Sequence, residues 1–220
     1  MIDAIMQSHY IKSLPFLFEG IVWTLLITFI GLFLGFIIGA ITGLGRISKN
    51  KFFRGISSVY VEVIRGTPIL VQVLFIYYGL SEDIIGFNID KLTAAISAIA
   101  VNAGAYIAEI VRGAVESVDK GQHEAGRSLG LSRRQTMRYI IWPQAFKRMI
   151  PPLGNQFVIS LKDTSLFSVI AVGEVLYMGK QYYNVNFSQF QTLIMVCLFY
   201  LAITIPTAIY LRRLERKLDV

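Results

Sequence analysis

Charged and polar side chains interrupt several long apolar stretches of this sequence, and these are the residues that could do chemistry there. Glu62 and Arg65 are followed directly by Gly66-Thr67-Pro68. Two charges three residues apart can form an ion pair on one helix face. Pro68 has no N–H to give to a helix and Gly66 weakens one, so we expect a kink. The segment is either a buried ion pair beside a kink, or an element that contacts or gates a polar ligand.

A second polar group lies in the next apolar stretch. Asn102, Tyr106 and Glu109 stand at offsets 0, 4 and 7, which places them on one face of a helix. A polar stripe in an apolar helix usually points into a helix bundle. These side chains could form hydrogen bonds between helices or contact a ligand, and the sequence leaves both readings open.

A third polar group is Lys162-Asp163-Thr164-Ser165, in the middle of an otherwise apolar stretch. Lys162 and Asp163 could neutralise charges on neighbouring helices, or Asp163, Thr164 and Ser165 could bind a ligand. The candidate ligand-binding residues are therefore Arg65, Thr67, Asn102, Tyr106, Glu109, Asp163, Thr164 and Ser165.

The composition indicates the kind of protein that must position these groups. Of 220 residues, 55% are hydrophobic and 16% charged, against about 25% charged in a soluble domain. Five stretches approach or exceed the roughly 20 apolar residues that span a bilayer: 21–44, 56–80, 92–115, 151–176 and 190–211. We predict an all-α membrane protein, with residues 1–220 forming one transmembrane domain of five helices. The single cysteine, Cys197, excludes a disulfide scaffold.

Lysine and arginine predict the orientation. They concentrate in residues 46–54, in the loop 116–150 and in the C-terminal tail. Because basic loops remain in the cytoplasm, the N-terminus is expected outside and the C-terminus in the cytoplasm. This topology explains the net charge of +7 without a nucleic-acid partner. Residues 1–20 mix apolar and polar positions, as in a helix lying in the outer interface.

Four glycines recur every four residues in the first stretch: Gly31, Gly35, Gly39 and Gly43. They form a groove on one helix face into which another helix can pack. The alternative is that this groove lines the path of a permeant.

The loop 116–150 contains helix signals that a disordered linker would not need. Ser132 and Gln135 match a capping box, and Gly130 suits the end of a preceding helix. Two short helices are expected, at about 120–129 and 132–141. A set of apolar residues could dock on another protein inside a rim of arginines, although a solvated basic loop is the alternative. The apolar set is Leu129, Leu131, Met137, Ile140 and Trp142.

The same loop resembles the EAA loop in the membrane subunits of bacterial ABC importers. Glu124-Ala125-Gly126, Gly130, Ile140 and Pro143 follow its spacing, with Gly126 in place of Ala and Trp142 in place of Leu. Further segments resemble the polar amino-acid branch of these permeases: Glu62 with 65–68 and Gln72, 108–113, 121–122, and 162–166.

The resemblance implies a fold like that of type I ABC importers, in a multi-pass protein of the bacterial inner membrane. It also implies the partners: a second permease copy or a sister permease, a dimer of cytoplasmic ABC ATPases, and an extracytoplasmic amino-acid-binding protein. The chain lacks the G-x-x-x-x-G-K-[ST] motif, so ATP and Mg²⁺ are expected on the ATPase and this chain is not expected to be an enzyme. No metal site is expected either. The residues that would couple to the ATPase are Glu124, Ala125, Gly126, Arg127, Ser128, Leu129, Gly130, Arg133 and Pro143.

The charges within the apolar stretches favour a basic substrate. Three acids, Glu62, Glu109 and Asp163, stand against two bases, Arg65 and Lys162. An excess of acid suits arginine, lysine or histidine. The predicted function is therefore ATP-driven import of polar, preferably basic, amino acids. Two alternatives are a secondary transporter in which Glu109 and Asp163 relay protons, and a membrane scaffold that transports nothing.

Overall fold

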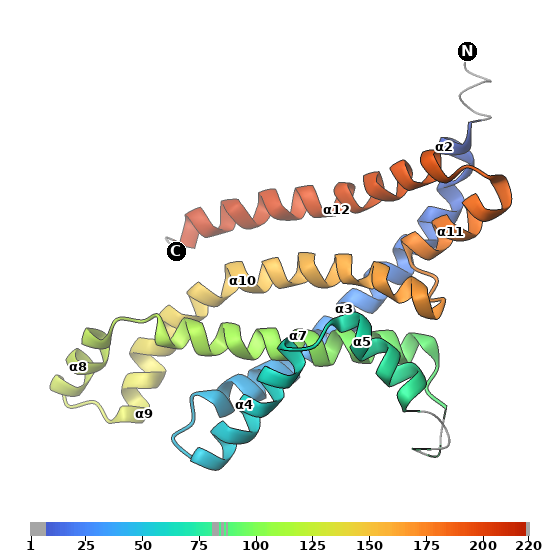
Figure 1. Cartoon of the computed structure of the whole chain (residues 1–220). Coiled ribbons are helices and arrows are strands. Elements are labelled where there is room, and N and C mark those ends of the chain that lie inside the picture. Colours follow the sequence, from blue (N-terminus) through green and yellow to red (C-terminus); the bar gives the residue numbers. More distant parts are fainter. Residues whose placement is uncertain (1–7, 81–83, 85, 87, 219–220) are drawn as a thin grey trace.

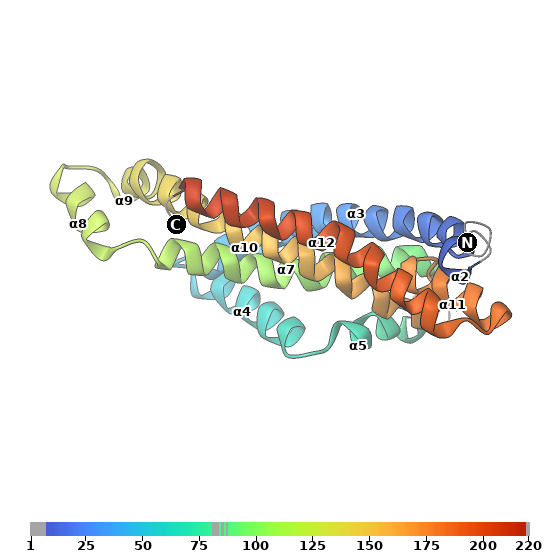
Figure 2. The same ribbon diagram turned by 90° about the horizontal axis from the view of Figure 1, so that it is seen from above.

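The computed structural model describes residues 8–80, 84, 86 and 88–218, and within them it contains helices and turns but no strand. The helices form an elongated bundle (Figures 1 and 2). Its centre is α7, Lys91–Glu116, which packs on α3, Leu14–Arg46, and on α10, Trp142–Asp163. α12, Gln189–Leu218, packs on the other side of α10.

The N-terminal segment differs from the predicted interfacial helix. Residues 1–7 lie outside the described residues, and the only separate helix is the short α2, His9–Lys12. Residues 14–20 instead form the first turns of α3, with Pro15 at the helix start and Leu17 fully buried. The apolar positions that suggested an interfacial helix are therefore partly explained by packing.

The glycine groove of α3 packs against α7, as predicted. A Cβ added to Gly39 would lie 2.6 Å from Cβ of Ile107, and one added to Gly43 would lie 2.7 Å from Cβ of Val111. The absence of side chains lets the two backbones approach closely over several turns. α7 begins cleanly because the Asp90 carboxylate accepts hydrogen bonds from the N–H groups of Leu92 and Thr93.

The second predicted stretch is a broken helix. α4, Lys51–Arg65, ends before Gly66, and α5, Ile69–Leu74, continues as a π-helical turn, Phe75–Gly79. The two parts meet at an angle of 100°. The kink expected at Gly66–Pro68 is therefore confirmed. Its physical cause is the extended backbone of Pro68, which opens α5.

The fourth predicted stretch, 151–176, has the wrong boundaries. α10 begins nine residues earlier and ends at Asp163, followed by the 3₁₀ helix Thr164–Ile170 and by α11, Val175–Asn186. Pro151 and Pro152 lie inside α10 rather than at its start. The preference for proline in a first helical turn is fulfilled by Pro143 instead.

In the described part of the chain, three helical segments are long and apolar enough to cross a membrane: His9–Arg46, Lys91–Glu116 and Gln189–Leu218. The bent pair α4 and α5 can provide a fourth span. α10 is not among them, because Lys147, Arg148, Lys162 and Asp163 place charges near both of its ends. The five-span count and the outside position of the N-terminus remain predictions.

Candidate functional site

A cavity of about 330 Å³ opens at the break between α4 and α5. α4 contributes Arg65, the break contributes Thr67, α7 contributes Asn102 and Tyr106, and α10 contributes Asp163. Five of the eight predicted ligand-binding residues therefore meet in one place. The remaining lining residues are Gly66, Pro68, Ile69 and Ile159.

Gln72 holds the broken backbone in place beside this cavity. Its buried side-chain amide donates to the carbonyl oxygen of Ile64 at 2.8 Å and lies 3.0 Å from that of Thr67. Its Oε1 accepts a hydrogen bond of 3.0 Å from the Asn102 amide. One side chain thus joins a carbonyl at the end of α4 to one in the break and ties the break to α7.

The cavity carries one basic and one acidic group. The Arg65 guanidinium lies over the Tyr106 ring, 5.2 Å from its centroid. Asp163 is the last residue of α10 and is half-buried, and within the described part of the chain no basic group lies within 4.0 Å of its carboxylate. The arrangement offers a cation, an anion, an amide and hydroxyl groups to one bound molecule.

Thr164 and Ser165 do not line this cavity. Thr164 is fully buried, and its hydroxyl donates to the carbonyl oxygen of Leu161 at 2.7 Å. Ser165 donates to the carbonyl oxygen of Lys162 and lines a different cavity, with Tyr200 of α12. The turn into the 3₁₀ helix after Asp163 directs the two hydroxyls elsewhere.

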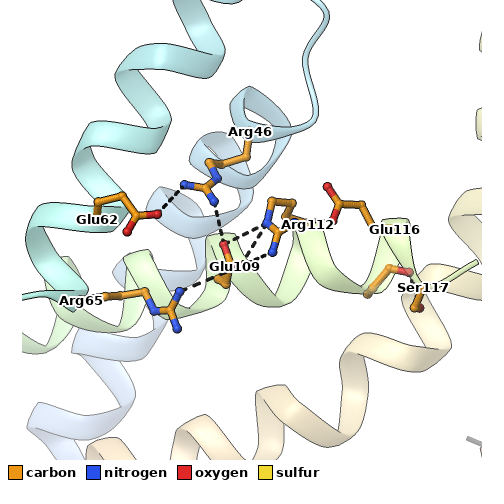
Figure 3. A network of polar contacts seen from close by, with 8 residues as sticks. Arg46, Glu62, Arg65, Glu109, Arg112, Glu116 and Ser117 are labelled. Carbon is orange, nitrogen blue, oxygen red and sulfur yellow. Dashed lines mark hydrogen bonds and ion pairs between the residues drawn. The ribbon is translucent and has the colours of Figure 1, made fainter.

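Glu109 lies outside the cavity, in a network of ion pairs (Figure 3). Its carboxylate accepts hydrogen bonds from Nε of Arg112 at 3.0 and 3.1 Å, and from Arg46 at 3.2 Å. Nη1 of Arg65 lies 4.0 Å away. Three arginines from three helices therefore surround one carboxylate.

Glu62 and Arg65 do not form the ion pair that their spacing allows. Glu62 contacts Arg46 instead, at 3.5 Å, and Arg65 turns toward Glu109. The other end of the network is the exposed pair of Arg112 and Glu116. Because Glu109 is neutralised by arginines, it adds no free negative charge to the cavity.

The loop 116–150 folds as the helix signals predict. α8, Lys120–Ser128, is capped by Asp119, whose carboxylate accepts a hydrogen bond from the N–H of Gly121. Gly130, with a φ of +80°, lies two residues after its end and stops the helix. Ser132 and Gln135 form the expected capping box at the start of α9, Arg133–Thr136, and a π-helical turn, Met137–Ile141, leads into α10.

Gly126 fixes α8 against this second helix. It is buried, and a Cβ added to it would lie 2.7 Å from Cγ2 of Thr136. Of the apolar residues that could dock on another protein, Met137, Ile140 and Trp142 pack partly against this chain's own core. Leu129 is 78% exposed and remains the large apolar side chain at the tip. Around it, Glu124, Ala125, Arg127, Ser128 and Arg133 are exposed.

Residues 31–220 match the family model for the binding-protein-dependent transport system inner membrane component. The chain belongs to this family of transport permeases. The permease is 48% identical over 208 residues to the glutamine transport system permease protein GlnP of Escherichia coli (strain K12), an alignment covering 94% of this chain and 95% of that protein. It is 33% identical to the arginine transport system permease protein ArtQ of Bacillus subtilis (strain 168), covering 96% of each.

The fold agrees with a solved structure. A crystal structure of an amino acid ABC transporter with histidines superimposes with a TM-score of 0.90 at 39% identity, covering 94% of this chain and 96% of that one. The permease is therefore an inner-membrane protein of the polar amino-acid ABC importer class, and its family is one of transporters rather than enzymes.

Two residues of the site are not predicted from the sequence. Gln72 belongs to a recognisable motif, but its role in holding the helix break becomes visible only in the structure. Arg46 has the pattern of a basic residue that sets topology, yet its side chain is 12% exposed and joins Glu62 to Glu109. The signal for Gln72 is a polar residue four positions after Pro68 in an otherwise apolar helix.

Proposed function

We propose that this permease moves a polar amino acid through the membrane by way of the cavity at the α4–α5 break. The observation that carries the proposal is the meeting of Arg65, Asp163 and Asn102 in one cavity. An amino acid carries a carboxylate and an ammonium group, which Arg65 and Asp163 would bind respectively. The cavity has a volume of about 330 Å³, within the range of about 300–1,000 Å³ typical of small-molecule sites.

The charge balance of the cavity suits an uncharged polar side chain, such as that of glutamine, ahead of a basic one. One acid and one base line the cavity, and Glu109 is held by arginines outside it. Asn102 and Thr67 would then face the side-chain amide of the substrate. The 48% identical relative is named for glutamine transport, which agrees with this choice. Counting charges along the sequence favours a basic amino acid instead. Uptake assays with the two kinds of substrate decide between these alternatives.

α8 is proposed as the contact with a cytoplasmic ATPase dimer that binds ATP and Mg²⁺. It projects beyond the end of the helix bundle (Figure 2). The exposed Leu129 provides an apolar anchor among polar and basic side chains, as at the centre of a small interface. A second permease, identical or related, and an extracytoplasmic binding protein complete the proposed importer.

The test is uptake by proteoliposomes that contain the permease with its ATPase, supplied with the binding protein and internal ATP. We expect ATP-dependent uptake of labelled glutamine above that of arginine. Asp163→Asn removes the one anion among the described residues that line the cavity and should lower uptake at least tenfold. Asp90→Asn is the matched control, because asparagine also caps a helix, and it should leave uptake unchanged.

Three results would contradict parts of this proposal. Uptake driven by a proton gradient without the ATPase would indicate a secondary transporter. Assembly with the ATPase but no uptake of any amino acid would indicate a scaffold. Higher uptake of arginine than of glutamine would show that the substrate is a basic amino acid.

A further inference from the structure

A groove of about 670 Å³ lies between the second half of α3 and the first half of α4. It shares no lining residue with the substrate cavity. Its walls include Ile38, Ile41 and Leu44 from α3 and Phe53 and Ile56 from α4. Ile41, Phe53 and Ile56 are all more than half exposed. The groove is therefore an open apolar channel along the side of the bundle.

Two polar groups in its lining are already hydrogen-bonded. The Tyr60 hydroxyl donates to the carbonyl oxygen of Val101 at 2.6 Å, and the Ser48 hydroxyl accepts from the N–H of Asn50. Ser57 is buried against α3. Most of the surface offered to an occupant is aliphatic side chains and an aromatic ring. Such a surface suits a chain without hydrogen-bonding groups, because a polar occupant would lose its hydrogen bonds to water without replacement.

Positive charge gathers at one end of this groove only. Lys49, Lys51 and Arg54 lie at the turn between α3 and α4 and are exposed. Among residues 8–80, 84, 86 and 88–218, no carboxylate lies within 4.0 Å of any of the three. Arg46, by contrast, is committed to Glu62 and Glu109.

The turn that presents these cations is ordered by its own side chains. The Ser48 hydroxyl accepts a hydrogen bond of 3.2 Å from the N–H of Asn50, and the Asn50 side chain accepts one of 2.9 Å from the N–H of Phe52, capping α4. Figures 1 and 2 place the turn at the same end of the molecule as α8. The charges thus face the side on which the ATPase is proposed to bind.

We propose that this groove binds one anionic phospholipid. One acyl chain would lie along the groove, and the phosphate and headgroup would lie against Lys49, Lys51 and Arg54. A long apolar surface with cations at a single end matches an amphiphile. A free phosphate would leave the groove empty, and an acidic protein segment would not need an apolar channel beside a membrane-spanning helix. Basic pockets between transmembrane helices are known to hold anionic headgroups.

The test is native mass spectrometry of the detergent-purified permease–ATPase complex, titrated with phosphatidylglycerol or phosphatidylcholine. We expect selective retention of phosphatidylglycerol by the wild type. Replacing Lys49, Lys51 and Arg54 by glutamine should lower its affinity by about fivefold for each cation removed. The matched control replaces three tail arginines, Arg212, Arg213 and Arg216, by glutamine and should retain the lipid.

A second pair of variants tests the groove itself. Thr42 lines it and is half-buried, so Thr42→Phe should fill it and release the lipid while all the cations remain. Ile30→Phe adds a ring about three turns from Thr42 on the exposed surface of α3, outside the groove, and should leave retention unchanged.

Three outcomes would overturn the proposal. Equal retention of phosphatidylglycerol and phosphatidylcholine would show that the headgroup charge is not recognised. If the tail variant loses as much lipid as the variant at Lys49, Lys51 and Arg54, diffuse surface charge explains the binding. Unchanged retention in Thr42→Phe would place the acyl chain elsewhere. A crosslink from Phe53→Cys, made in a chain with Cys197→Ser, to a second permease would show that a protein covers the groove.

Discussion

Glu109 offers a direct test of whether the buried ion network supports the fold or binds substrate. Glu109→Gln keeps the shape of the side chain and removes its charge. At 3.2 Å, the Arg46–Glu109 attraction is about 5 kcal/mol at an effective dielectric constant of 20, before desolvation is subtracted. Removing one partner of a fully buried pair costs about 3–5 kcal/mol. Because the Glu109 side chain is 22% exposed, we expect a loss of about 2–4 kcal/mol.

The matched control is Glu116→Gln, which removes a charge that pairs with the same arginine. Glu116 is 57% exposed and pairs with Arg112 one helical turn away, so its loss should cost only about 0.3–0.5 kcal/mol. The measurement is the Tm of the purified complex, together with glutamine uptake per folded complex. A loss of about 3 kcal/mol lowers Tm by on the order of 10 °C in a chain of this length. The control should change Tm by about 1 °C.

The pattern of results separates the two roles of Glu109. A lower Tm with normal uptake per folded complex would support the structural role. An unchanged Tm with lost uptake would refute it and return Glu109 to the set of substrate ligands expected from the sequence. Equal Tm shifts in both variants would show that burial of the network contributes nothing.

Three further predictions follow from the packing. Gly39→Ala would bring a Cβ 2.8 Å from the backbone oxygen of Gly104, so it should lower the free energy of unfolding by about 1–3 kcal/mol, measured by thermal unfolding. The control is Gly113→Ala, whose Cβ meets nothing within 4 Å and should leave the stability of the permease unchanged. Gln72→Leu removes the 2.8 Å donor to the Ile64 carbonyl oxygen and the 3.0 Å donor to that of Thr67, which should lower ATP-dependent glutamine uptake by reconstituted complexes, while membrane fractionation should show unchanged insertion. Gly130→Val forces a β-branched residue to a φ of +80°, which should reduce co-purification of the ATPase severalfold; unchanged co-purification would remove α8 from that interface.

Local features were the part of this fold that the sequence could predict. Gly66 and Pro68 stand two positions apart in the sequence, and their backbone effects need no knowledge of tertiary structure. The same holds for the capping box of Ser132 and for Gly130. The role of the glycines of α3 is also predictable, because a helix face without side chains has few uses other than close helix packing.

Long-range partners could not be predicted. Glu62 and Arg65 have a suitable spacing to pair, but Arg46 reaches Glu62 from another helix and leaves Arg65 to Glu109. Nothing near Asp163 indicated that α10 ends there, because the 3₁₀ helix continues with a similar apolar pattern. Three of the eight predicted ligands, Glu109, Thr164 and Ser165, were therefore misplaced relative to the cavity for reasons of tertiary structure.

Helical backbone runs without interruption from Arg133, beside α8, to Asp163 at the cavity. At 1.5 Å per residue these 31 residues would measure about 46 Å if straight. A tilt of about 3° at one end would then displace the other by about 2.4 Å, close to the length of a hydrogen bond. If α8 binds the ATPase as proposed, a small rotation at that end of the continuous helical segment would therefore move the Asp163 carboxylate relative to a solute in the cavity.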